Sequence, residues 1–510
     1  MTDVVLVIPP YHYKTKVLTS SVKEYAGMGF LAAVLRQHGH GVEILDCDLA
    51  GFDIDETVEA IIDRNAPLIG LTMLQVAAYP TLEIVRRLRQ RGVTAHITLG
   101  GHFPSFTVDE LLDREDGVDS IVIGEGEYTL LELTRAILAG DEWREISGIA
   151  YWRDGESLTT EPRPLVKDLD SLPFQERDTL REVLERGGQA AIITSRGCYG
   201  NCAFCSVNAF YKKSPGMKWR ARSPENVGEE LEHLVNAWGA SIFVFNDDNF
   251  IGPGKGGKDR AARVAEEILH RGLNIQFAIP AAVNDVEPEL FDLLKKAGLR
   301  SVFLGVESMN QEDLKYLNKH TTIEQNETAI GILEELGIFY QIGFIMFYPN
   351  STIEQVEYNI RYVKDHIVNN NYCGTQVFTG ELRILHGTSL HDRLAGEPFV
   401  HEDLFHYTYS MEDSRVEELR YLMDHLILKK TFPLMVDCKE EFMGASPKRI
   451  IRAMICDLQL GMALRAVSYL KKEGTVTPKA IKTIIREMNQ GAERIQREGQ
   501  RQGWVEAEIQ

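Results

Sequence analysis

Short apolar runs alternate with amphipathic stretches along most of this 510-residue chain, and this alternation limits its fold more than any other feature. Examples of the runs are VVLVI, LIGLTML and AHITLGG. Continuous apolar runs are typical of strands covered on both faces, and such strands joined by helices form parallel sheets. The runs within residues 1–147 therefore predict a doubly wound α/β domain of the Rossmann-like, flavodoxin-like type.

A second alternation begins at Ala190 and continues to about residue 400. One of its helices is predicted over Pro224–Trp238, with Ser223 as N-cap and proline at the first helical position. The last strand that we expect is GTQVFTGELRI, residues 374–384. About six β/α repeats predict a parallel sheet that curls into a partial (β/α) barrel.

The two alternations are separated by a connecting segment, residues 148–188, in which we expect a hairpin turning at Asp154–Gly155. Beyond His401 the pattern is helical and shows no turn-rich strands. We therefore predict four parts: a Rossmann-like domain, a linker, a partial barrel and a helical C-terminal region. Their boundaries are 1–147, 148–188, 189–400 and 401–510.

The formal net charge of −20 argues against a general nucleic-acid binder, because phosphate contacts need a basic surface. No stretch approaches the roughly 20 apolar residues of a membrane helix. Three of the seven cysteines fall close together and the others are scattered, which fits reduced thiols better than a disulfide scaffold. We therefore expect a cytoplasmic protein without a membrane span.

Residues 194–206 read TSRGCYGNCAFCS, so Cys198, Cys202 and Cys205 have the spacing Cys-x3-Cys-x2-Cys. Three thiolates on one loop can hold three irons of a cubane cluster, which leaves the fourth iron open. An open metal position binds and activates a substrate, whereas a closed site is structural. The alternatives are chance clustering, a zinc site with a further ligand, and a closed cluster completed by Cys373.

This spacing, with Phe204 before the third cysteine, resembles the signature of the radical S-adenosylmethionine (SAM) superfamily. The resemblance covers roughly residues 188–395 and includes the later segments SIFVFNDDNF, SVFLGVES, GFIMFYPNST and LRILHGTSLH. It implies a partial (β/α) barrel with a 4Fe–4S cluster in the loop after the first strand. It also implies that the open iron chelates SAM, which is cleaved to a 5′-deoxyadenosyl radical.

Carboxylates at the C-terminal ends of barrel strands face the active-site side. We therefore expect Asp247 and Glu307 to contact the ribose or the methionine part of SAM, and the resemblance adds Ser308. Salt bridges to neighbouring helices are the alternative. Arg220 and Arg222, which follow the cysteine loop, are candidates for binding the SAM carboxylate or a substrate acid, and solvated surface arginines are the alternative.

The first domain resembles the cobalamin-binding domain of the B12-dependent radical SAM family. The matching segments are VIPPY, YAGMGFLAAVLRQHGHGVEILD, LIGLTML, ITLGGHFPS and VIGEGEYTLLEL. Glycines at the predicted strand ends allow backbone to approach a large flat ligand, and a threonine offers a hydroxyl for the nucleotide tail. These candidate cofactor-binding residues are Thr72, Gly100, Gly101, Gly124 and Gly126.

The Asp-x-His-x-x-Gly motif of cobalamin mutases is absent, so no histidine is marked as a lower axial ligand. We expect His102 to be a loop residue bonded to backbone, and approach to the corrin as a ligand is the alternative. No Gly-x-Gly-x-x-Gly follows the first strand, which disfavours a dinucleotide cofactor. A packing module that has lost its ligand is the alternative for this domain.

The resemblance implies a cobalamin-dependent radical SAM methyltransferase that acts on an unactivated carbon of a small natural-product or lipid-like intermediate. It also implies an electron donor such as flavodoxin or ferredoxin. The alternatives are a cyclase or rearrangement enzyme with the same cofactors, an enzyme whose first domain is empty, and a non-enzymatic iron–sulfur or cobalamin sensor. The sequence names no catalytic residue.

Overall fold

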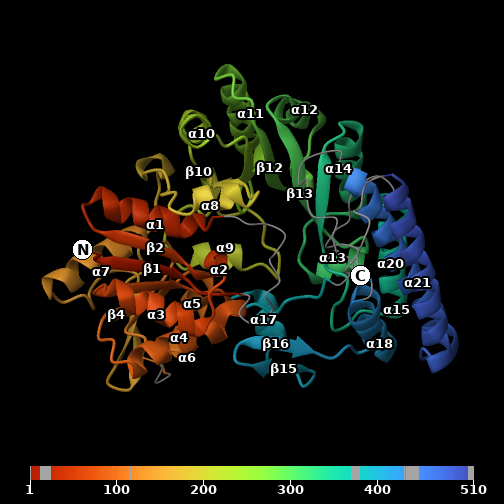
Figure 1. The fold of residues 1–510 in the computed structure, drawn as a ribbon, viewed down its shortest axis with the longest axis horizontal. Coiled ribbons are helices and arrows are strands. Elements are labelled where there is room, and N and C mark those ends of the chain that lie inside the picture. The colour runs from red at the N-terminus through yellow and green to blue at the C-terminus, as the bar shows by residue number, and fades with distance from the viewer. Residues whose placement is uncertain are drawn as a thin grey trace. The chain divides into compact units, whose positions relative to one another are not determined.

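The computed structural model describes residues 2–11, 24–113, 117–368, 380–429, 431 and 447–502 (Figure 1). The chain divides into two compact units. The first unit comprises Met1–Ile275, Ile384–Ala395 and Glu402–Tyr407, and the second comprises Gln276–Arg383, Gly396–His401 and Thr408–Gln510.

The first unit contains a seven-stranded sheet in the order β2-β1-β3-β4-β5-β6-β7. The parallel strands are β1 (Val4–Ile8), β2 (Val42–Asp46), β3 (Leu68–Thr72), β4 (His96–Gly100) and β5 (Ser120–Val122). The hairpin β6 (Ile149–Arg153) and β7 (Glu156–Thr159) pairs antiparallel to β5. The predicted doubly wound domain is confirmed, and the hairpin predicted in the connecting segment forms the edge of the same sheet.

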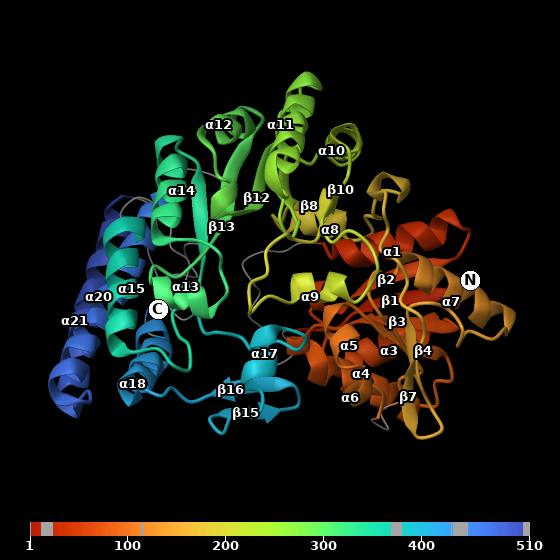
Figure 2. The ribbon, with the colours of Figure 1, turned by 180° about the vertical axis from the view of Figure 1, so that it is seen from behind.

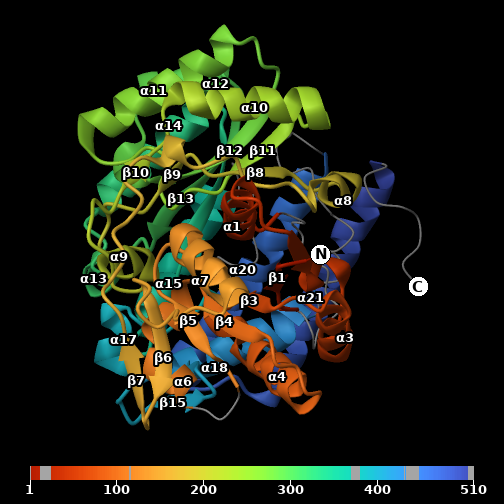
Figure 3. The ribbon, with the colours of Figure 1, turned by 90° about the vertical axis from the view of Figure 1, so that its left-hand side faces the viewer.

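Helices cover both faces of this sheet (Figure 3). The helices α1 (Ala26–Gln37) and α7 (Glu127–Ala139) lie over one face, and α3 (Ile54–Arg64) and α4 (Ala78–Gln90) lie over the other. The shorter helices of this region are α2 (Cys47–Ala50), η1 (Gln75–Ala77), α5 (His102–Phe106) and α6 (Val108–Leu112). Side chains alternate along each strand. Val5 and Val7 therefore pack toward α3 and α4, whereas Leu6 packs toward α1.

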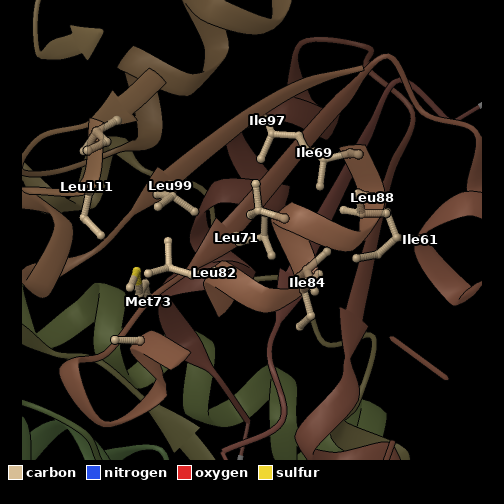
Figure 4. Packing of buried hydrophobic residues seen from close by; sticks show 14 of the residues in the cluster. Ile61, Ile69, Leu71, Met73, Leu82, Ile84, Leu88, Ile97, Leu99 and Leu111 are labelled. Atoms are coloured by element: carbon tan, nitrogen blue, oxygen red, sulfur yellow. The ribbon is translucent and has the colours of Figure 1, made fainter. Parts of the chain in front are cut away.

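Figure 4 shows the core beneath α3 and α4, where Ile61 and Leu88 of the helices pack on Ile69 and Ile97 of the strands. All four side chains are buried. Burial of side chains of this size stabilises a fold by roughly 1.5–3 kcal/mol each.

The rest of the first unit surrounds the cysteine segment. Strand β8 pairs parallel to β11, and β9 pairs antiparallel to β10. Ser223 caps α10 as predicted, because its side chain accepts from the Asn226 backbone N–H. The elements are η2 (Leu169–Ser171), α8 (Leu180–Glu185), β8 (Ala190–Ile192), β9 (Ser195–Arg196), α9 (Ser206–Lys212), β10 (Arg220–Ala221), α10 (Pro224–Trp238), β11 (Ile242–Phe245), α11 (Gly254–His270) and α17 (Ser389–Leu394).

In the second unit, β12 (Gln276–Ala282), β13 (Leu299–Glu307) and β14 (Phe339–Phe344) are parallel neighbours. These strands and β8 and β11 are the parallel strands that the second alternation predicts. The helices that accompany β12, β13 and β14 are η3 (Val283–Asp285), α12 (Pro288–Lys296), α13 (Gln311–Tyr316), α14 (Ile323–Glu335), α15 (Ile353–Tyr362) and η4 (Val363–Val368). The last predicted strand lies mostly outside the described residues.

The C-terminal region of the second unit is helical, as predicted. Helix α20 packs against both α15 and α21 (Figure 2). Its helices are α18 (Ser414–Leu422), η5 (Met423–Leu428), α20 (Pro447–Glu473) and α21 (Pro478–Arg501). Among the residues that the structure describes, no helix is both long and apolar enough to cross a bilayer.

The prediction that no strand follows His401 is wrong. The chain forms β15 (Val400–Asp403) and β16 (His406–Tyr409), which are joined by Leu404 and Phe405. Both turn residues have positive φ values of 44° and 67°. Glycine or asparagine usually fills such positions, so the sequence carries no recognisable signal for this hairpin.

Candidate functional site

A cavity of about 300 Å³ lies at the C-terminal ends of the parallel strands in the first unit. In open α/β sheets ligands bind beyond these strand ends. The five residues predicted to bind cobalamin all line the cavity: Thr72, Gly100, Gly101, Gly124 and Gly126.

Two of these glycines occupy positions that other residues rarely adopt. Gly101 has φ +107°, and a Cβ there would lie 3.4 Å from the Thr72 hydroxyl oxygen. Gly124 has φ +76°, and a Cβ there would lie 2.8 Å from the Ser214 hydroxyl oxygen. Positive φ favours glycine because it has no Cβ. Both strand ends therefore depend on the missing side chain.

Most of the cavity wall is apolar. Its apolar side chains include Leu6, Met28, Phe30, Leu31, Leu71, Leu99, Val122, Leu130 and Ile193. A preformed apolar pocket with few polar anchors is typical of cofactor sites. Such a wall suits contact with an apolar ligand surface.

His102 also lines the cavity, but the prediction that it is a loop residue is wrong. It is the first residue of α5, and its ring stacks on Phe210 with a centroid distance of 3.9 Å. Burial lowers the pKa of His102 to about 4. The imidazole is therefore neutral at pH 7.

The three cysteines of the predicted cluster lie on one loop between β9 and α9. The Gly200 N–H donates to Cys198 Sγ at 3.3 Å. A Cβ at Gly200 would lie 3.4 Å from Cys198 Sγ and 3.8 Å from Cys202 Sγ, so both sulfurs face the same backbone segment. Burial raises the pKa of the Cys205 thiol to about 12, and the neighbouring thiols add to this rise. A thiol must lose its proton to bind a metal, so binding of a cluster would release this proton.

Within the described residues, no three His, Cys, Asp or Glu side chains converge on a position for a single metal ion. A mononuclear zinc site requires such convergence. The thiolates of a cubane cluster bind different irons, so they are spread around the cluster. Three thiols on one loop form a donor set that fits three irons of a cluster. Cys373, the possible further ligand, lies outside the described residues.

Two consecutive aspartates after β11 hold the chain that precedes the cysteines. Asp247 accepts from the Thr194 and Ser195 backbone N–H groups at 2.6 and 2.8 Å. It also accepts from the Thr194 hydroxyl at 2.7 Å. Asp248 lines the cavity and accepts from the Gly197 N–H at 2.8 Å. Burial raises the pKa of both carboxyl groups. Asp247 was predicted to contact SAM, but both of its carboxylate oxygens accept hydrogen bonds from Thr194 or Ser195.

Arg220 and Arg222 are buried, so the alternative that they are solvated surface residues is wrong. Arg222 pairs with Glu230 and donates to Asn226 Oδ1 at 2.6 Å. Arg220 donates to Glu125 at 2.9 Å, while its Nε and Nη2 are buried without a hydrogen-bond partner in the part of the chain that the structure describes.

Glu307 and Ser308 lie at the end of β13 in the second unit. Glu307 is buried, has φ +67° and pairs with Lys319 at 3.0 Å. A left-handed conformation outside glycine stores strain, and such strain clusters at functional sites. The Ser308 hydroxyl donates to Asp313 at 2.7 Å. The alternative for Glu307 was a salt bridge to a neighbouring helix; its salt bridge is to Lys319, which lies between α13 and α14.

Several cavity residues escaped the sequence prediction: Phe30, Glu125, Glu127, Arg196, Phe210, Tyr211 and Asp248. Two of them, Glu125 and Glu127, alternate with the glycines of the GEGE segment after β5. Gly124 and Gly126 were already predicted to line a site, so the acids next to them in the sequence could have been predicted to line it too. Arg196 and the two aromatic residues carry no comparable signal in the sequence.

Comparison with known families matches both regions. The B12 binding domain family matches residues 24–134, and the Radical SAM superfamily matches residues 192–363. An uncharacterized methyltransferase of Pyrococcus horikoshii is 28% identical over 364 residues, which cover 71% of this chain and 77% of that protein.

The anaerobic magnesium-protoporphyrin IX monomethyl ester cyclase of Rubrivivax gelatinosus is 30% identical over 355 residues, which are 67% of this chain and 62% of the cyclase. This chain thus spans less than two thirds of the cyclase. Among solved structures, the cobalamin-dependent S-adenosylmethionine radical enzyme OxsB, with aqua-cobalamin and S-adenosylmethionine bound, has a TM-score of 0.78 at 19% identity. The alignment covers 99% of this chain and 82% of OxsB, which shows a shared fold.

The two matched domains occur in the expected order, each over the elements described above. Together they identify the cofactors as cobalamin, a 4Fe–4S cluster and SAM. The chain belongs to the radical SAM enzymes that carry a B12-binding domain.

Proposed function

We propose that this enzyme is a cobalamin-dependent radical SAM methyltransferase that acts on an unactivated carbon of a small natural-product or lipid-like intermediate. The observation that carries the proposal is the shared wall of one cavity. Strand-end residues of the B12-binding domain line it together with Ser195, Arg196 and Asp248, which flank or hold the cysteine loop. The methyltransferase of Pyrococcus horikoshii supports the same reaction class.

We propose Cys198, Cys202 and Cys205 as the three cluster ligands. Their common loop, the Gly200 N–H bond to Cys198 and the two sulfurs facing Gly200 support this assignment. We propose Glu307 and Ser308 as SAM-binding residues. The positive φ of Glu307 is a strained backbone conformation, and such conformations cluster at functional sites. Asp247 then contributes by holding the loop instead of touching SAM.

We propose that cobalamin binds where Thr72 and the four cavity glycines meet the apolar wall. When bound, the three cofactors supply a 5′-deoxyadenosyl radical for hydrogen abstraction and a methyl group for transfer. The apolar wall of the cavity excludes water. Burial keeps His102, which lines the same cavity, neutral. Neutral, apolar surroundings protect a radical from side reactions, and fixed positions raise the effective concentration of the reacting groups.

A second function is favoured by the Rubrivivax gelatinosus cyclase, which is 30% identical to this chain. Such an enzyme would use the same cofactors for ring formation or rearrangement without methyl transfer. The mass of the product separates the two functions, because methylation adds one methyl group and consumes two SAM molecules.

The test is anaerobic reconstitution with iron, sulfide and hydroxocobalamin, followed by turnover with SAM and a panel of candidate substrates. We propose flavodoxin or ferredoxin as the physiological electron donor. The methyltransferase proposal predicts 5′-deoxyadenosine, S-adenosylhomocysteine and a methylated product. Formation of 5′-deoxyadenosine with an unmethylated, cyclised or rearranged product would favour the second function.

A further inference from the structure

Four buried charged residues, Glu125, Glu127, Arg196 and Arg220, form one ion-paired group that we call the buried quartet. Arg196 donates to Glu125 at 2.9 Å and to Glu127 at 2.6 Å. Arg220 donates to both oxygens of Glu125 at 3.0 and 2.9 Å. None of the four side chains is more than 10% exposed. The quartet has two cations and two anions, so it is neutral as a whole.

The two arginines occupy paired positions on adjacent strands. Strands β9 and β10 form a two-residue antiparallel ribbon in which Arg196 is the register partner of Arg220. Like charges at such a position repel each other, and a buried cation without a counter-charge is strongly unfavourable. Glu125 accepts from both arginines, and its Oε2 also accepts from the Val166 N–H at 2.7 Å. The ribbon is therefore neutralised by an acid from outside it.

The ribbon closes the cysteine loop. Strand β9 ends at Arg196 and β10 begins at Arg220, so all three cysteines lie on the segment between them. At the base of the loop a Cβ on Gly197 would lie 2.0 Å from the Lys218 carbonyl oxygen, which shows how closely the two sides approach. Charge repulsion between the arginines would act at this point and separate the ends of the loop.

Glu125 belongs to the other cofactor's domain. It follows β5 and stands between Gly124 and Gly126 in the wall of the cavity. Glu127, the first residue of α7, pairs with Arg196, whereas Glu125 pairs with both arginines. Within the quartet, loss of Glu125 leaves two buried cations against one anion, and Asp248 is a further acid near both arginines. Loss of Glu127 leaves Glu125 between the arginines.

We propose that Glu125 is a positioning residue for the iron–sulfur cluster, although it lies in the B12-binding domain. It neutralises the ribbon at the base of the cysteine loop and so holds the three thiols at the spacing that the cluster needs. The inference rests on the proposed ligation of the cluster by Cys198, Cys202 and Cys205. Assembly of the cluster would then depend on Glu125, a residue of the B12-binding domain, although the first cluster ligand, Cys198, lies in the radical SAM domain.

The test compares reconstituted wild-type protein with Glu125→Gln, which keeps the size of the side chain and removes its charge. We expect the iron content per chain to fall to less than half and the electron paramagnetic resonance spectrum of the reduced cluster to change, with far-ultraviolet circular dichroism unchanged. The matched control is Glu132→Gln on α7, the helix that follows Glu125, since Glu132 pairs with Arg163 and is 45% exposed. This control should load iron as the wild type does.

A compensating variant separates charge from general damage. Glu125→Gln combined with Arg220→Gln removes one charge of each sign and leaves the Arg196–Glu127 pair intact. We expect this double variant to recover most of the iron content and the wild-type spectrum, even if Glu125→Gln alone fails to fold.

Two results would overturn the inference: Glu125→Gln that loads iron fully with an unchanged spectrum, or a double variant no better than the single one. Wild-type protein that loads no cluster would instead refute the proposed function, so the two failures are distinguishable.

Discussion

The loop after β5 lines the cavity, the loop after β9 starts at Arg196 on the wall of the same cavity, and the two loops are built by opposite means. The first relies on absent side chains, since Gly124 and Gly126 leave backbone open to a ligand. The second relies on buried acids, since Asp247 and Asp248 accept from the backbone that leads to the cysteines. A large flat cofactor needs room, whereas a charged cluster needs fixed ligands. The comparison suggests that each loop can be damaged without the other, except through Glu125.

The largest expected effect is loss of the iron–sulfur cluster while cobalamin binding is retained. Replacing Cys198, Cys202 and Cys205 together by alanine should abolish iron–sulfur absorbance and 5′-deoxyadenosine formation, because the loop then has no thiolate to hold iron. Cobalamin binding, measured by the corrin absorption bands, should persist. Cys47→Ala is the control, since Cys47 is buried beside the sheet and far from the loop in sequence. Retained SAM cleavage in the triple variant would contradict the ligand assignment.

The next largest expected effect is weaker cobalamin binding while iron content is retained. Gly101→Val places a branched side chain at φ +107° and fills the cavity beside Thr72. We expect the Kd for hydroxocobalamin to rise at least ~10-fold, equivalent to about 1.4 kcal/mol, while iron content stays unchanged. Gly51→Ala is the matched control, because it has φ +71° and open space around it. Equal cobalamin affinity in Gly101→Val would place the corrin elsewhere.

A smaller effect tests how the cysteine loop is held. Asp247→Asn keeps one carbonyl oxygen but loses the charge that accepts from Thr194 and Ser195. Urea denaturation should show that the free energy of unfolding falls by about 1–3 kcal/mol. Iron content should fall as well, and cobalamin binding should stay unchanged. Asp259→Asn is the control, because Asp259 pairs with Lys255 on an exposed face of α11. If cobalamin binding fell as much as iron loading, the two loops would not be separable.

The smallest effect concerns pH. Folded His102 takes up its proton only below about pH 4, whereas the unfolded chain does so below about 6.5. Between these values the unfolded state binds more protons, so this residue makes the cofactor-free protein less stable as pH falls. Thermal denaturation at pH 7 and pH 4.5 should therefore show a smaller drop in Tm for His102→Phe than for wild type. Equal drops would show that His102 is not held neutral by burial.

The sequence was sufficient to locate the cavity because strand ends of a parallel sheet meet at one edge. Thr72 and the four glycines follow three apolar runs, so their common position depends only on the alternation. The choice between Asp247 and Asp248 was not predictable, since adjacent residues at a strand end point in opposite directions. Arg196 was also missed, because its partner Glu125 is brought to it only by the fold.

The measurement that tests the account most directly is the anaerobic reconstitution of the wild-type chain with iron, sulfide and hydroxocobalamin, read by absorbance, electron paramagnetic resonance and SAM cleavage. The account predicts corrin bands, a reducible 4Fe–4S signal that changes when SAM is added, and release of 5′-deoxyadenosine. A protein that shows no iron–sulfur signal and releases no 5′-deoxyadenosine would contradict it.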